Sequence, residues 1–377
     1  MELLLLDMDG VLLHPNGYHE ALRDNVRMWA DALGFEGADL SRDAIHFFES
    51  AGVSAEWVSG SMCVGLMMVE RWKHEPALQI PSSLHPLRSP VLRRSPDFGN
   101  FAREVLDASD HRRPVETGIR LLESRCATRE QAVQLRQLVE SATSFQHSPF
   151  HRIQQELVLG SELMRDVYGV EPVLDSRGYL LTRDRPAVSE NCRAQLLAWR
   201  GHAGQEAVVM TNRPTRAPDG KRGSPEAELG LQLLGLEALP VAGMGAVNWL
   251  AEKAGLTAEA RLKPHAAHAL AAIRLSTGEG MAASLTAVAA LLDEGEVDAG
   301  WRALDGASIT VLEDSVNGCL SALDAGERLR KAGIEVAINL VGVAESGAKR
   351  RVLDGLGASL YASSEAALQA ARVCDGS

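Results

Sequence analysis

Cysteine is scarce in this chain, and its five copies are scattered. No two of them form a Cys-x-x-Cys pair, and their number is odd. A set of this kind argues against a disulfide framework and against a zinc ribbon, so the sequence favours a protein of a reducing compartment. The five are Cys63, Cys126, Cys192, Cys319 and Cys374.

Long hydrophobic runs are absent as well. The N-terminal apolar run Leu3–Leu6 is too short for the core of a secretion signal, no basic residue precedes it, and Asp7 follows it directly. No later stretch approaches the length of a membrane span. We therefore expect a cytoplasmic protein with no membrane partner.

Positive charge is in short supply. The chain has 38 Lys and Arg residues against 50 Asp and Glu residues, a formal net charge of -12. Non-specific binding to nucleic acid depends on Lys and Arg that neutralise phosphates, so this balance opposes it. The 377 residues, 46% of them hydrophobic, are enough for two domains with cores of their own.

The most informative motif follows the first apolar run. Asp7-Met8-Asp9-Gly10 comes directly after Leu3–Leu6. A short apolar run that ends in two carboxylates and a glycine indicates a buried parallel strand whose C-terminal tip holds acidic side chains in a crevice. The alternative is a solvated turn after an edge strand.

Three later segments carry polar residues at expected strand or helix boundaries. A β-branched run ends in Thr211-Asn212, Lys263 precedes a proline placed to open a helix, and a third apolar run ends in Glu313-Asp314. Taken singly, Thr211 could be a helix cap, Lys263 a solvated side chain, and the acidic pair a helix N-terminal charge pair.

Together, in this order, the four motifs resemble those of the haloacid dehalogenase (HAD) superfamily. The resemblance covers residues 1 to about 13 and about 186 to 377. It implies an α/β fold with a doubly wound, Rossmann-like parallel sheet. Residues 14–185 resemble no family that we can name.

The resemblance implies a role for each matched residue. Asp7 would be the nucleophile that forms an aspartyl-phosphate, and Asp9 the acid and base that serves the leaving group and then water. Thr211 and Lys263 would hold and neutralise the transferring phosphate. Asn212 would orient the phosphate or the nucleophile, and Gly10 would let the chain turn tightly beside the site.

The acidic residues of the first and last motifs also predict a metal site. All of the available donors are oxygen atoms, which suits Mg²⁺. The expected ligands are Asp7, the backbone carbonyl of Asp9, Glu313 and Asp314, and Gly318 would let the following helix pack close to them.

We therefore expect a magnesium-dependent phosphomonoester hydrolase that acts on a small phosphorylated metabolite. A sugar phosphomutase would use the same Asp7 and Asp9 but return the phosphoryl group to a substrate hydroxyl. A non-catalytic binding protein on a degenerate core is a third reading, and the presence of every acidic and basic motif position argues against it.

The domain organisation follows from the position of the first motif. Because 13 residues cannot form a domain, the first strand must join the sheet of the C-terminal half, and residues 14–185 form an insertion. We expect this large insertion to be a mainly helical cap domain, and residues 1–13 with 186–377 to form the core. The expected cap helices are His19–Leu33, Ser41–Ser50, Phe98–Ser109, Thr128–Ala142 and Phe150–Tyr168.

For several other segments the sequence favours a structural role over a functional one. Pro76–Pro96 contains too many prolines for a helix, and Met281–Leu292, within an insertion at 276–307, predicts an extra surface helix. The loop Arg213–Gly223 carries four cations that could bind a second anionic group, but a solvated loop is favoured. His265 and His268, three residues apart, are expected not to bind metal.

Overall fold

The structure is a computed structural model that describes residues 1–53, 55–85, 91–109, 113–218, 220, 223–344 and 347–375. The chain divides into two compact units. The first consists of Met1–Pro15 and Asp184–Ser377, and the second of Asn16–Arg183. The boundaries expected from the sequence, after residues 13 and 185, differ from these by two residues each.

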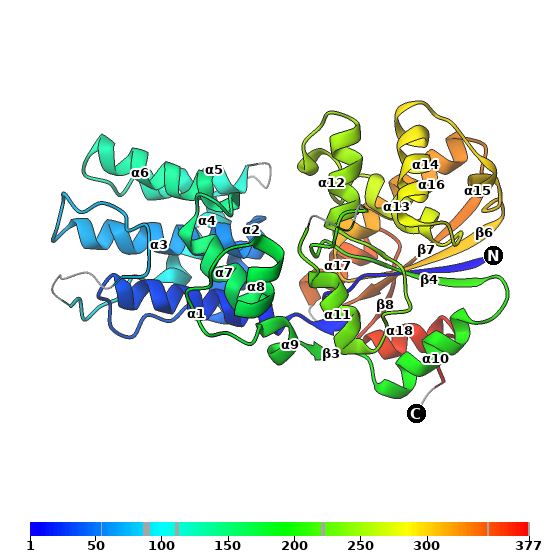
Figure 1. Ribbon diagram of the computed structural model, residues 1–377, viewed down its shortest axis with the longest axis horizontal. Helices are drawn as coiled ribbons and strands as arrows, with labels where there is room; N and C mark the ends of the chain where they lie inside the picture. The colour runs from blue at the N-terminus through cyan, green and yellow to red at the C-terminus, as the bar shows by residue number, and fades with distance from the viewer. Residues whose placement is uncertain are drawn as a thin grey trace. The chain divides into compact units, whose positions relative to one another are not determined.

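The first unit is built on a six-stranded sheet with the strand order β5-β4-β1-β6-β7-β8 (Figure 1). Every pair of neighbouring strands runs parallel. The expected α/β fold with a parallel sheet is thereby confirmed. The strands are β1 (Glu2–Leu6), β4 (Gln205–Met210), β5 (Val241–Ala242), β6 (Ala307–Glu313), β7 (Val336–Val343) and β8 (Ser359–Tyr361).

Helices cover both faces of this sheet because its strands are apolar on both faces. Leu3 and Leu5 of β1 belong to one hydrophobic cluster, whereas Leu4 and Leu6 belong to another. Figure 1 shows α13, α14 and α16 on one side of the sheet and α10 and α18 on the other. The helices of this unit are α10 (Glu190–Arg200), α11 (Glu226–Leu234), α12 (Met244–Lys253), α13 (Ala267–Leu275), α14 (Met281–Asp293), α15 (Ala299–Arg302), α16 (Val316–Lys331), α17 (Gly347–Asp354) and α18 (Ser364–Ala370).

One helix begins later than the sequence predicted. Pro264 was expected to open a helix, but α13 begins at Ala267, and Pro264 lies in the turn before it after a cis peptide bond. The intervening turn is held in place by Asp324, whose Oδ2 accepts a hydrogen bond from the backbone N–H of Ala266 at 3.0 Å. Lys263 therefore lies in a turn, three residues before the helix cap.

The insertion at 276–307 does contain the expected helix, α14. It is more than a surface addition, because Leu285 and Val288 are fully buried in the same hydrophobic cluster as Leu3 and Leu5 of β1. Trp301 of α15 is also fully buried in this cluster.

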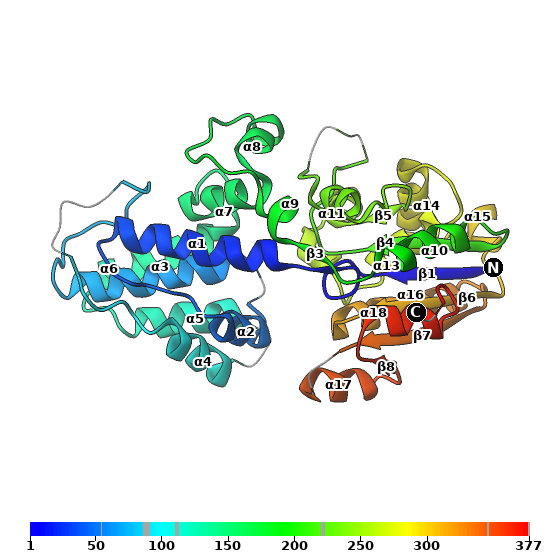
Figure 2. The same ribbon diagram turned by 90° about the horizontal axis from the view of Figure 1, so that it is seen from below.

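The secondary-structure elements described in the second unit are all helices, connected by loops (Figure 2). Its longest helices are α1 and α3, and Gly160 divides the predicted helix Phe150–Tyr168 into α7 and α8. Helix α3, nearly all of whose residues are buried, was not expected from the sequence. The helices are α1 (Asn16–Ala32), α2 (Arg42–Ala51), α3 (Glu56–Trp72), α4 (Phe98–Ala108), α5 (Pro114–Glu123), α6 (Arg129–Glu140), α7 (Pro149–Leu159), α8 (Ser161–Tyr168) and α9 (Tyr179–Arg183).

No single helix in the described part of the chain is long and apolar enough to cross a membrane. The helices α2 and α3 reach that length only as a pair, across a bend of 113°. In the proline-rich segment, residues 76–85 and 91–96 contain no helix, as expected, and residues 86–90 lie outside the described part.

A short ribbon joins the two places where the chain leaves and re-enters the first unit. Strand β2 (Leu13–His14) pairs antiparallel with β3 (Arg185–Pro186). The backbone N–H of Ala187 extends this pairing by donating to the carbonyl of Leu12 at 2.9 Å. Pro15 and Asp184, the end residues of the two segments, are therefore held close together within this unit.

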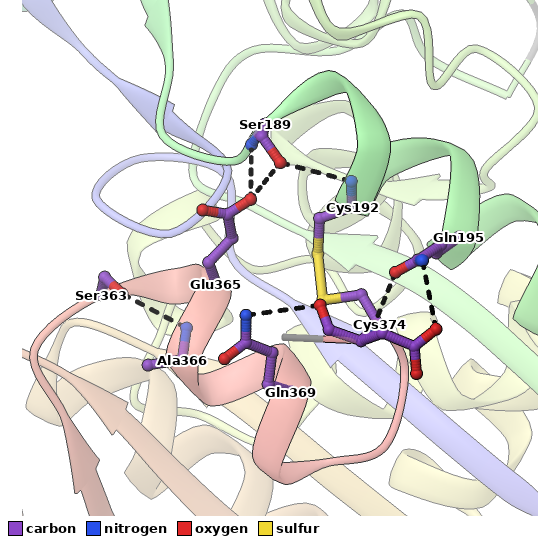
Figure 3. Close-up of a disulfide and its surroundings, with 9 residues drawn as sticks. Ser189, Cys192, Gln195, Ser363, Glu365, Ala366, Gln369 and Cys374 are labelled. Atoms are coloured by element: carbon purple, nitrogen blue, oxygen red, sulfur yellow. Dashed lines mark hydrogen bonds between the residues drawn. A yellow bond between two sulfur atoms is a disulfide. The ribbon is translucent and has the colours of Figure 1, made fainter. Parts of the chain in front are cut away.

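The cysteine interpretation was wrong in one respect, because Cys192 and Cys374 form a disulfide (Figure 3). It connects the first turn of α10 to the segment after α18, 182 residues further along the chain. Gln195 reinforces the junction, since its Oε1 accepts a hydrogen bond from the backbone N–H of Asp375 at 2.8 Å. The other three cysteines are free thiols.

Candidate functional site

Three strands bring the predicted motifs to one edge of the sheet. In the parallel register, Leu6 of β1 lies beside Val209 of β4 and Leu312 of β6. The residues that follow these positions therefore leave the sheet together at its C-terminal edge, where open α/β sheets bind their ligands. At this edge Asp7 directly follows β1, and Glu313 is the last residue of β6.

Lys263 joins these strand ends. Its Nζ donates hydrogen bonds to Asp7 Oδ1 at 3.0 Å, to the carbonyl of Met210 at 3.0 Å and to Glu313 Oε1 at 2.5 Å. The Lys263 side chain is only 3% exposed, and that of Glu313 is not exposed at all. This ammonium group therefore neutralises two buried carboxylates.

A cluster of three carboxylates could hold a cation. Oxygen atoms of Asp7, Glu313 and Asp314 all lie within 4.8 Å of one another. Asp314 also accepts a hydrogen bond from Lys349 of α17, which is its counter-ion. The side chain of Asp9, the fourth predicted metal residue, is not part of this cluster; its backbone carbonyl was the expected donor.

Burial and mutual repulsion perturb these groups. Burial, reinforced by the charge of Glu313, raises the pKa of Asp7 well above its ordinary value, although Lys263 acts in the opposite direction. Burial also raises the pKa of Asp314, against the effect of Lys349. Burial alone would lower the pKa of Lys263, but the charges of Asp7 and Glu313 outweigh it and raise that pKa. A divalent cation among the carboxylates would favour their ionised forms.

Two glycines let the backbone approach the cluster closely. Gly10 has a φ of +78°, and a Cβ there would overlap the Asp314 carboxylate. A Cβ on Gly318 in the first turn of α16 would overlap the Glu313 carboxylate. Both glycines therefore leave room for acidic side chains of the cluster.

The side chain of Asp9 meets an unexpected partner. Arg213 Nε lies 3.0 Å from each carboxylate oxygen of Asp9, and Arg213 Nη2 lies 2.5 Å from Asp9 Oδ1. The same Nη2 lies 2.8 Å from Asp184 Oδ2. The side chains of Arg213 and Asp184 are 1% and 0% exposed.

This finding corrects the expectation for the loop Arg213–Gly223. Arg213 is not a solvated loop residue, because it is buried between two carboxylates. Arg216 is exposed, as expected, while residues 219, 221 and 222 lie outside the described part. The signal that could have indicated Arg213 is its place directly after Thr211-Asn212 in the second motif.

The remaining predicted site residues lie at the end of β4. Thr211 is 1% exposed, and its Oγ1 accepts a hydrogen bond from the backbone N–H of Arg213 at 3.1 Å. Asn212 is exposed to solvent.

His268 of α13 is fully buried, and its Nε2 lies 3.0 Å from the carbonyl oxygen of Ala242. Burial lowers the pKa of His268 to about 3, so this imidazole is neutral.

Comparison with known proteins adds information on the fold. No protein-family model matches the chain, and no curated protein matches it. The chain is similar to the X-ray structure of a Northeast Structural Genomics Consortium target, with a TM-score of 0.60 and 15% identity. The match covers 96% of this chain and 95% of that one. At this identity the similarity shows a shared fold alone.

Proposed function

We propose that this protein is a magnesium-dependent phosphomonoester hydrolase of the HAD type. The observation that carries the proposal is the contact of Lys263 with Asp7 and Glu313, 256 and 50 residues away in sequence. Residues of the first, third and fourth motifs thus meet at the C-terminal edge of one parallel sheet, beside the strand that carries the second motif.

The proposed reaction has two displacements at phosphorus. A carboxylate oxygen of Asp7 forms a bond to phosphorus while the bond from phosphorus to the ester oxygen breaks, and Asp9 gives a proton to that oxygen. A water molecule then attacks the aspartyl-phosphate, Asp9 takes its proton, and the carboxylate of Asp7 is restored as inorganic phosphate leaves. Lys263 neutralises negative charge beside the nucleophile in both displacements.

The carboxylate cluster fits a magnesium ion. Its donors are oxygen atoms only, and their spacing allows them to share one cation. Asp7, Glu313, Asp314 and the backbone carbonyl of Asp9 would hold the ion. When bound there, it would supply positive charge to the transferring phosphoryl group.

We further propose that the helical second unit, residues 16–183, acts as a cap that selects a small phosphorylated substrate. It is inserted between β1, which Asp7 directly follows, and β4, which Thr211 directly follows. An insertion at this position can supply binding energy from the non-reacting part of a substrate and exclude water during the reaction.

Release of inorganic phosphate from a panel of phosphate esters, measured with magnesium and with EDTA, tests the proposal. Asp7→Asn should abolish turnover while the protein stays folded, since Asn is isosteric with Asp and Glu313 remains as a counter-ion of Lys263. Glu237→Gln, which neutralises an exposed carboxylate, is the matched control and should keep full activity. Wild-type turnover by Asp7→Asn would refute the mechanism, and conversion of a sugar phosphate to its isomer without phosphate release would indicate a phosphomutase.

A further inference from the structure

Arg213 is a buried cation shared by two carboxylates, one of them the proposed acid and base Asp9. Its guanidinium group contacts Asp9 through Nε and Nη2 and contacts Asp184 through Nη2. Removing a guanidinium group from water is costly unless its charge is balanced. The fully buried Asp184 contributes to that balance.

The two oxygen atoms of Asp9 are not equivalent in this arrangement. Oδ1 accepts from both Nε and Nη2 of Arg213, at 3.0 and 2.5 Å, whereas Oδ2 accepts only from Nε, at 3.0 Å. Oδ1 is therefore the oxygen that the guanidinium group holds most firmly. Oδ2 is the oxygen with more lone-pair capacity left for a further contact.

We propose that Arg213 and Asp184 are positioning residues for Asp9, which rests on the proposed phosphatase function. Arg213 fixes the carboxyl group of Asp9 through Oδ1 and leaves Oδ2 to exchange the proton. Asp184 fixes the guanidinium group of Arg213 through Nη2. Without Asp184, the guanidinium group would lose one of its anchors and would place the carboxyl group of Asp9 less firmly.

If Arg213 positions Asp9, the loss of rate on replacing Arg213 should depend on the leaving group of the ester. When the ester bond breaks, its electron pair goes to the leaving oxygen, and the proton on Asp9 Oδ2 is transferred to that oxygen. An alkoxide needs this proton, whereas p-nitrophenolate is a stable anion and leaves without it. A defect in the placement of Asp9 should therefore slow the hydrolysis of alkyl phosphates much more than that of p-nitrophenyl phosphate.

The test compares kcat/KM for a simple alkyl phosphate with kcat/KM for p-nitrophenyl phosphate, in the full-length protein. General acid catalysis contributes on the order of 100-fold or more, so Arg213→Gln should lower the alkyl-to-aryl ratio by at least about tenfold. Asp184→Asn should also lower the alkyl-to-aryl ratio.

The matched control is Arg274→Gln. It removes another guanidinium group that is 1% exposed and paired with two acids, Glu279 and Asp298. It should destabilise the protein but leave the ratio unchanged.

The outcomes separate this inference from the proposed function. If the wild-type protein hydrolyses esters and the folded Arg213→Gln and Asp184→Asn variants keep its alkyl-to-aryl ratio, the positioning role is wrong and the phosphatase function stands. If the wild-type protein hydrolyses no ester, both fail. Should Arg213→Gln not fold, Arg213→Lys carries the same test, because lysine keeps the charge but lacks the planar fork that holds Asp9.

Discussion

Lys263 Nζ lies 3.0 Å from Asp7 Oδ1 in a buried contact between residues 256 positions apart in sequence. The same ammonium group lies 2.5 Å from Glu313 Oε1. Removing one partner from a buried ionic contact leaves the others as uncompensated charges, which is more costly than the pair itself is stabilising. This cation is therefore a structural support of the site as well as a part of its proposed chemistry.

Lys263→Met should lower the free energy of unfolding by about 3 kcal/mol or more and abolish phosphatase activity. Adding Glu313→Gln should recover part of the stability and none of the activity, because it removes one of the two stranded carboxylates. Urea unfolding measures the first effect. The control is Lys331→Met, which breaks the exposed pair with Glu327 and should change stability by less than about 1 kcal/mol. Wild-type stability of Lys263→Met would contradict this account.

The strand ends of the site were predictable because each has a local signature. An apolar run that stops at Asp7 or at Glu313 indicates both a strand and its acidic tip. Arg213 and Asp184 carry no such signature, since a Pro- and Gly-containing segment with several cations is typical of solvated loops. Asp184 directly precedes strand β3 of the β2–β3 ribbon, and it meets Arg213 only once distant parts of the chain are folded together.

The same limit applies to the prediction of the fold, because some of its features have no local signature in the sequence. Helix α3 was not predicted, because nearly all of its own residues are buried. It therefore has no polar face from which a helical periodicity could be recognised. Helix α6 was predicted, since Thr128 caps it and charged residues alternate with the buried Leu135 and Val139. The pairing of Cys192 with Cys374 could not be read from two single cysteines 182 residues apart.

Magnesium should raise the melting temperature of the protein if the cluster of Asp7, Glu313 and Asp314 binds it. Saturation at about 100 times the dissociation constant would add about 2.7 kcal/mol to the free energy of unfolding. Asp314→Asn should remove most of this effect, whereas Glu237→Gln should keep it. Differential scanning calorimetry over a magnesium titration makes the measurement. An identical magnesium response in Asp314→Asn and the wild-type protein would exclude the cluster as the site.

Reduction of the Cys192–Cys374 disulfide should destabilise the first unit. Cross-linking residues 182 positions apart restricts the unfolded chain, which in the chain-entropy model contributes up to about 5 kcal/mol. Dithiothreitol should therefore lower the melting temperature of the wild-type protein but not that of the double variant Cys192→Ser, Cys374→Ser. Cys126→Ser, at a partly buried free thiol, should respond to dithiothreitol as the wild type does. Equal melting of the oxidised wild type and the double variant would show that the cross-link contributes nothing.

The second unit should have a pH-dependent contact between His19 and Glu49, whose Nε2 and Oε1 lie 2.8 Å apart. Burial alone would lower the pKa of His19, but Glu49 raises it; burial alone would raise the pKa of Glu49, but His19 lowers it. The contribution of His19 is complete below its ordinary value of 6.5 and is lost as the pH rises through its raised pKa. The contribution of Glu49 is complete above its ordinary value of 4.5 and is lost as the pH falls through its lowered pKa.

The contact should therefore stabilise the unit most between these two ordinary values. The stability difference between wild type and Glu49→Gln, measured by thermal unfolding across a pH series, should be greatest there. It should be on the order of 0.5 kcal/mol, because the pair is partly exposed. Glu171→Gln, which removes the highly exposed partner of Arg165, should show no such maximum. A difference that grows steadily above neutral pH would have the wrong sign for this contact.

Replacing residues 16–183 with a short linker should separate the chemistry from substrate selection. The β2–β3 ribbon holds the two ends of the cut together, and Asp7, Asp9, Lys263 and the Asp184 partner of Arg213 all remain. Weak hydrolysis of p-nitrophenyl phosphate should therefore persist, provided that thermal unfolding shows a folded core. Hydrolysis of the best ester found in the panel should fall much further, because the second unit would no longer supply binding energy. A folded core that keeps full kcat/KM on that ester would show that specificity is determined within the first unit.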